Sequence, residues 1–85
     1  MDHDEGFATP RWHIGQIMER VLQLAQVSPD EVAASVGVLP HDLDRFLAGA
    51  ELPSRLMLER FARACGADPI VLLMVRDDQQ RRTRV

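Results

Sequence analysis

The segment that begins at Ser28 constrains the fold of this chain most strongly. Ser28 can cap a helix, Pro29 suits the first helical position, and Glu31 can reach back to complete a capping box. Gly37 can end this helix, because glycine readily adopts the left-handed conformation found at helix C-termini. We therefore predict a short helix over about 29–36, followed by a tight turn.

A second short helix is expected directly after this turn. Pro40 again suits the first helical position, although Leu39 before it has no side-chain oxygen for capping. Apolar residues then recur at helical spacing and predict an inward-facing stripe, which comprises Leu43, Phe46 and Leu47. Gly49 follows, so we expect this helix to end near residue 48.

Apolar periodicity and local start signals predict three further helices. Thr9 and Pro10 mark the start of the first, in which Gly15 is a slightly unfavourable residue. Ser54 and Asp68 can cap the other two. The three helices are expected over about 10–26, 54–65 and 69–76.

The chain is long enough for one domain. Its 85 residues are 46% apolar, as is normal for a globular protein, and five predicted helices make that domain all-α. We place the domain at residues 9–76. Residues 1–8 are expected to be a disordered acidic N-terminal tail, and residues 77–85 a polar, arginine-rich C-terminal tail.

All ten cationic side chains are arginines, and the net charge is −3. Arginine suits bidentate contact with phosphate, carboxylate or guanine, but codon usage in a GC-rich genome is the favoured explanation of an arginine-only inventory. A net negative charge is not typical of a strong non-specific DNA binder. Any nucleic-acid binding must therefore depend on how the charges are placed.

Other classes of protein are not indicated. Cys65 is the single cysteine, so no intramolecular disulfide can form, and the acidic start is unlike a signal peptide. We therefore expect a cytoplasmic protein. The longest apolar run, residues 70–75, is far shorter than the roughly 20 residues that span a bilayer, so we expect no membrane association.

Catalysis and metal binding are not expected either. The three histidines, His3, His13 and His41, lack the spacing of metal ligands. The chain shows no arrangement of a nucleophile with a base and no glycine-rich loop that could hold a phosphate. We predict a protein without enzymatic activity, metal or cofactor.

The order of these segments resembles the Cro/C1-type (XRE-like) helix-turn-helix repressor domain over roughly residues 14–73. Ser28-Pro-Asp-Glu-Val-Ala33 resembles the family's capped second helix, and Val36-Gly-Val38 resembles its turn. Leu43-Asp-Arg-Phe-Leu-Ala-Gly49 is similar to the end of its recognition helix. Leu52-Pro-Ser54 and Phe61-Ala-Arg-Ala-Cys-Gly-Ala-Asp-Pro69 are similar to the start and end of its fourth helix.

The resemblance implies a small transcriptional regulator that binds double-stranded DNA and reads a short inverted repeat through the helix at about 39–48. The residues that it places at the bases are Pro40, His41, Asp44 and Arg45. Ser28, at the start of the preceding helix, would approach a phosphate. Arg55, at the start of the fourth helix, would contact the phosphate backbone on the other side.

The last predicted helix is apolar on all sides, and one helix of a small domain cannot bury every side against its own core. The resemblance implies a homodimer, because such domains often use their final helix as an interface. We expect Ile70, Leu73 and Met74 to form that interface.

The predicted DNA-facing surface is acidic, which favours a second hypothesis. Asp30, Asp42, Asp44 and Glu51 would all approach a polyanion. Instead of reading a base, Arg45 is expected to pair with Asp42 or Asp44 in its own helix or to lie solvated on the surface. The same scaffold can therefore serve as a protein-interaction module with weak or no DNA binding. Its partner would be another regulator, a polymerase or sigma component, or a cytoskeletal protein.

Overall fold

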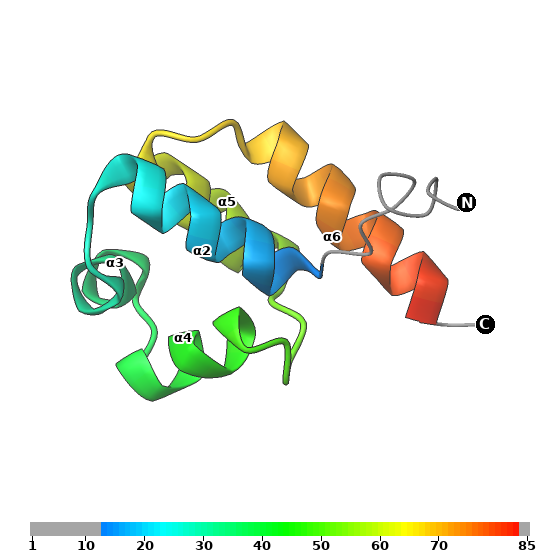
Figure 1. Ribbon diagram of the computed structural model, residues 1–85, viewed down its shortest axis with the longest axis horizontal. Coiled ribbons are helices and arrows are strands. Elements are labelled where there is room, and N and C mark those ends of the chain that lie inside the picture. Colours follow the sequence, from blue (N-terminus) through cyan, green and yellow to red (C-terminus); the bar gives the residue numbers. More distant parts are fainter. Residues whose placement is uncertain (1–12, 84–85) are drawn as a thin grey trace, which may run out of the picture.

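The computed structural model describes residues 13–83, which form five helices and no strand (Figure 1). The helices are α2 (Ile14–Ala25), α3 (Pro29–Val36), α4 (Pro40–Leu47), α5 (Arg55–Cys65) and α6 (Pro69–Thr83). The all-α prediction is thus confirmed for this part of the chain. The predicted acidic tail at 1–8 and the predicted cap Thr9 lie outside the described residues.

The start of α2 differs from the prediction. His13 is its N-cap, with an extended backbone (φ −85°, ψ 162°), so a continuous helix from about residue 10 is wrong. The Gln16 backbone N–H donates to His13 Nδ1 at 3.2 Å, and the His13 backbone N–H donates to Gln16 Oε1 at 3.0 Å. A histidine and a glutamine therefore form the capping box that a serine and a glutamate form elsewhere in this chain.

The predicted start and end of α3 are confirmed. Ser28 Oγ accepts from the Glu31 backbone N–H at 3.2 Å, and Glu31 Oε1 accepts from the Ser28 backbone N–H at 3.3 Å. Gly37 then ends the helix in the left-handed conformation, with φ 89°. Leu39 makes no side-chain capping bond, and α4 begins at Pro40 after a connection of residues 37–39. The two helices are thus joined by a tight turn.

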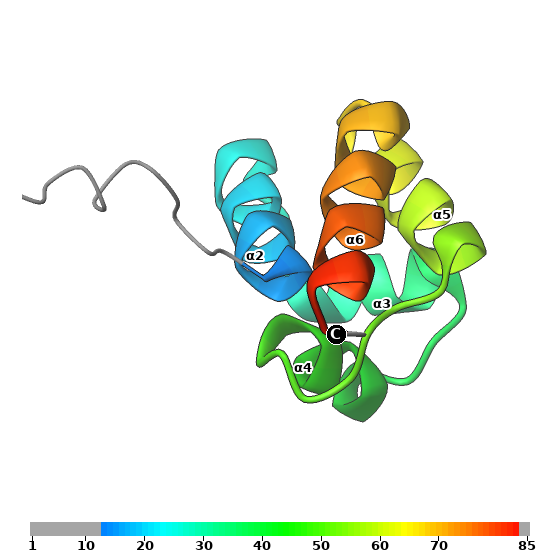
Figure 2. The same cartoon turned by 90° about the vertical axis from the view of Figure 1, so that its right-hand side faces the viewer.

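The helices form two groups around one core. In both views α4 lies lowest, with α3 beside it, and α2 runs antiparallel to α6 (Figures 1 and 2). α5 packs against α2, α3 and α6. The fully buried large side chains come from both groups and include Ile14, Met18, Leu43, Leu58, Phe61 and Leu72. This shared core fixes α4 against the rest of the molecule.

Gly15 allows α2 to approach α4 closely. A Cβ atom at this position would collide with the Phe46 backbone oxygen and would lie 2.6 Å from the Leu47 backbone oxygen. Gly15 is itself buried. Glycine is unfavourable inside a helix, but it is required here because any larger side chain would prevent this close approach of the two backbones.

The predicted end of the last helix near residue 76 is wrong, because α6 continues to Thr83. Arg76 Nε donates to the Pro53 backbone oxygen at 2.9 Å, and the Ile14 backbone N–H donates to Gln79 Oε1 at 2.5 Å. These bonds connect the second half of α6 to the loop before α5 and to the start of α2. Arginines in the last turn also suit the negative end of the helix dipole.

Candidate nucleic-acid interface

α4 turns one face to the core and the other to solvent. Leu43 and Phe46 are buried, as their helical spacing predicted. The four residues that sequence reasoning placed at DNA bases, Pro40, His41, Asp44 and Arg45, are all exposed. Their spacing of one and four residues gathers them on one side of the helix. The structure therefore brings these four candidates together on an accessible surface.

Arg45 does not pair within its own helix. Its Nη2 lies 3.2 Å from Glu51 Oε1, in the loop that follows α4, and each side chain is about half exposed. Exposed ion pairs of this kind contribute little to stability. The pair therefore bears mainly on where the Arg45 guanidinium points. Glu51 lies beyond the end of α4, so helical spacing could not indicate it and suggested Asp42 and Asp44 instead.

The surface formed by α3, α4 and the following loop is acidic. Between residues 28 and 51 there are five carboxylates, from Asp30, Glu31, Asp42, Asp44 and Glu51, and one arginine, Arg45. The Ser28 hydroxyl, which was expected near a phosphate, accepts a hydrogen bond in the α3 cap. A hydroxyl in that role can still donate its own hydrogen to an approaching oxygen.

Arg55 is exposed at the start of α5 and pairs with Asp77 of α6 through Nη1 and Oδ2. The other carboxylate oxygen of Asp77 accepts from Arg76 Nη1 at 3.0 Å. The hydrogen bond from Arg55, and then the one from Arg76, hold the pKa of Asp77 below its ordinary value. Sequence reasoning missed this arrangement, because residues 55 and 77 belong to different helices and no local spacing connects them.

The predicted dimer residues do not share one face of α6. Ile70 and Met74 are each 65% exposed, whereas Leu73 is half-buried and packs against the core. Val71 on α6 and Leu24 on α2 are also exposed apolar side chains that the sequence analysis did not single out. On α6 the exposed apolar side chains are therefore Ile70, Val71 and Met74.

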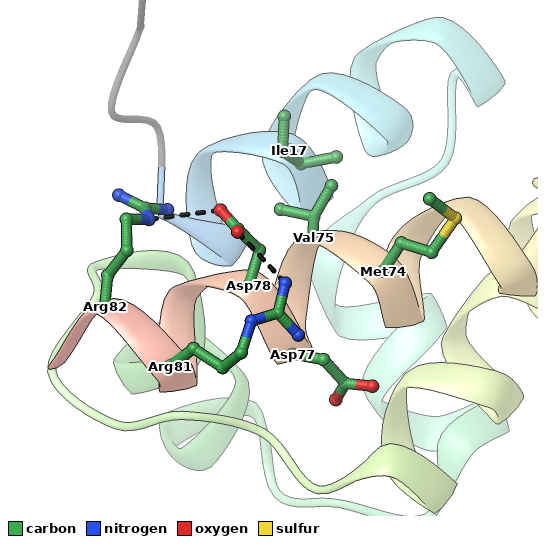
Figure 3. Close-up of a pocket in the computed structure, with 7 residues that line it drawn as sticks. All are labelled: Ile17, Met74, Val75, Asp77, Asp78, Arg81 and Arg82. Atoms are coloured by element: carbon green, nitrogen blue, oxygen red, sulfur yellow. Dashed lines mark hydrogen bonds and ion pairs between the residues drawn. The ribbon is translucent and has the colours of Figure 1, made fainter. Parts of the chain in front are cut away.

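A hollow lies between α2 and α6 (Figure 3). Ile17 of α2 and Val75 of α6 meet at its base, with Met74 beside them. Asp78 pairs with Arg81 at 3.2 Å and with Arg82 at 3.1 Å along its rim (Figure 3). The charged side chains of the rim are therefore largely engaged in ion pairs.

Other features of the described residues bear on the predicted classes of function. Burial raises the pKa of the Cys65 thiol, which does not favour thiolate chemistry. No group of three or more His, Cys, Asp or Glu side chains within residues 13–83 is arranged to hold a metal ion. None of the helices described is long and apolar enough to cross a membrane.

Comparisons with protein-family models, with curated proteins and with solved structures found no match to this chain.

Proposed function

We propose that this protein is a small DNA-binding transcriptional regulator of the Cro/C1-type helix-turn-helix class, without enzymatic activity. The observation that carries the proposal is the pair of short helices α3 and α4, joined by a tight turn at Gly37, with one face of α4 buried and the other exposed. This is the arrangement by which a helix-turn-helix presents its second helix to the major groove.

In this proposal α4 enters the major groove and Arg45 reads a base. Arginine grips the O6 and N7 atoms of guanine with two hydrogen bonds. His41 and Pro40 lie one turn earlier on the same exposed surface and would face neighbouring bases. Asp44 can accept a hydrogen bond from a cytosine amino group. The N-terminus of α3, with Ser28, and the start of α5, with Arg55, would flank the phosphates.

A homodimer would read an inverted repeat through two copies of α4. Half-sites are then expected about one helical turn, or roughly 34 Å, apart along the DNA. Ile70 and Met74 supply exposed apolar surface for the contact, whereas Leu73 packs against the core. The protein acts in the cytoplasm in this proposal.

The test is selection from a randomised pool of duplex DNA at low and moderate salt. We expect a short palindrome to be enriched, and Arg45→Ala to weaken discrimination at one position by about 1–3 kcal/mol. Arg63→Ala is the matched control, since Arg63 is also exposed and pairs with Glu59 at 2.8 Å, but on α5. Absence of any enriched sequence at either salt concentration would refute DNA reading.

The acidic surface supports a second candidate function, a protein-interaction module. Five carboxylates against one arginine between residues 28 and 51 favour a basic protein surface over DNA. The partner in this case is another regulator, a polymerase or sigma component, or a cytoskeletal protein. A pull-down that returns one protein at stoichiometric amounts after nuclease treatment, together with no enriched DNA sequence, would favour this candidate.

A further inference from the structure

The carboxylate of Asp77 bridges two arginines that differ in how they are held. Arg76 is fixed, since its side chain is 14% exposed and it donates to the Pro53 backbone oxygen at 2.9 Å and to Gln80 Oε1 at 3.1 Å. Arg55 is 56% exposed at the start of α5, where Asp77 Oδ2 binds its Nη1. Arg76 therefore fixes the position of the Asp77 carboxylate, and that carboxylate in turn pairs with the exposed Arg55.

A carboxylate in this position has the chemistry of a phosphate oxygen. Both groups are anions that accept hydrogen bonds from a guanidinium in the same planar geometry. Asp77 stays ionised throughout the physiological pH range, because its two arginine neighbours stabilise the charged form. Arg55 is also the residue that, in the proposed complex, lies beside the DNA backbone.

We propose that Asp77 competes with a DNA phosphate for Arg55 and thereby limits the affinity of the protein for DNA. This inference rests on the proposed function, since it concerns the backbone contact of that complex. In the free protein α6 withholds the guanidinium of Arg55. On DNA, the Asp77 carboxylate keeps Arg55 from neutralising a phosphate, so this contact is added only when the carboxylate is removed.

The number of phosphates that a protein neutralises is measured by the salt dependence of binding. Each phosphate contact steepens the plot of log affinity against log salt by about 0.9 for duplex DNA. The test variant is Asp77→Asn, which keeps the shape of the side chain and removes its charge. Between 50 and 200 mM salt, its affinity for a duplex of unrelated sequence should fall about 3.5-fold more than that of the wild type, from that same slope of about 0.9.

Two further variants make the measurement specific to Arg55. Glu59→Gln removes the same charge and releases Arg63, which also lies on α5 but two turns beyond its start. We expect its salt dependence to match that of the wild type. The double variant Arg55→Ala/Asp77→Asn should lose the steeper slope, because the released arginine is then missing. Asp77→Ala, as a second removal of the carboxylate, should behave like Asp77→Asn.

The inference is overturned if Asp77→Asn binds duplex DNA with a salt slope equal to or shallower than that of the wild type. It is also overturned if Glu59→Gln steepens the slope as much as Asp77→Asn does, or if Arg55→Ala/Asp77→Asn keeps the steeper slope. Circular dichroism of each variant establishes that it is folded under the binding conditions. The proposed function fails by a different result, the lack of any sequence enriched by the wild type. Non-specific duplex binding and sequence selection thus report on the two proposals separately.

Discussion

Gly15 shows at the scale of one residue how the position of α4 is determined. The helix that contains it would gain from an alanine, since alanine is favoured over glycine inside helices by about 1 kcal/mol. The backbone oxygens of Phe46 and Leu47 occupy the place where that methyl group would lie. Backbone atoms cannot move aside as a flexible side chain can, so we expect the collision to outweigh the helical preference.

We predict that Gly15→Ala lowers the free energy of unfolding by about 1–3 kcal/mol, the usual cost of overpacking a core. Urea denaturation followed by circular dichroism measures this change. Ala34→Gly is the matched control, because residue 34 is exposed within α3 and involves only helix propensity. Ala34→Gly should lower the free energy of unfolding by about 1 kcal/mol. The two variants would then show that alanine is the more stable residue at position 34 and glycine at position 15. A Gly15→Ala protein as stable as the wild type would contradict this account.

Single residues differ in how far they can be predicted from sequence. Ser28, Glu31 and Gly37 act on backbone groups a few residues away, so local spacing was sufficient to predict both ends of α3. Arg45 has three carboxylates within six residues, and the path of the loop after α4 decides in favour of Glu51. That path depends on packing, which local spacing does not describe.

At the scale of elements, α6 departs most from the sequence prediction. Its apolar residues stop at Val75, and polar residues in the last turns were interpreted as a tail. The helix instead continues, because Arg76 and Gln79 bind backbone groups of two distant segments. Such bonds offset the low apolar content of this half of the helix. They arise only once α2 and the loop before α5 are in place, so periodicity could not indicate them.

The pairing of α5 with α6 predicts a dependence of stability on acid. The pKa of Asp77 lies below its ordinary value of 3.8 in the folded protein, so the folded state releases this proton more readily than the unfolded state. The stabilisation is therefore complete above about pH 4 and is lost as the pH falls through the folded-state pKa. We expect the urea midpoint of the wild type to decline over this acidic range.

Asp77→Asn isolates this contribution. The variant has no carboxylate to protonate at this position, so the difference in urea midpoint between the two proteins should be largest near neutral pH and should shrink below pH 3.8. The other carboxylates titrate in both proteins and cancel in the difference. A difference that is constant from neutral pH to the acid limit would show that the ion pair does not stabilise the fold.

For the whole molecule, charge is unevenly distributed between the two groups of helices. Residues 28–51 carry one arginine against five carboxylates, whereas α5 and α6 together carry Arg55, Arg60, Arg63, Arg76, Arg81 and Arg82 against Glu59, Asp77 and Asp78. Most of these arginines are paired with a neighbouring carboxylate. The surface available to DNA therefore depends on which ion pairs open, and on whether a second copy doubles the contact area.

The proposed dimerisation through α6 rests on the exposure of Ile70 and Met74, each 65% accessible. We predict that Met74→Glu shifts the protein to a monomer in sedimentation velocity while its circular dichroism is unchanged, because the substitution places a charge in an apolar contact without touching the core. Leu39→Glu is the matched control. Leu39 is 67% exposed but lies at the start of α4, far along the chain from the proposed interface, and this variant should remain dimeric.

Leu73→Ala should instead lower the unfolding free energy, since Leu73 packs on the core. A wild-type protein that sediments as a monomer at all concentrations would rule out this interface. An inverted repeat would then have to be read by two copies that meet only on the DNA.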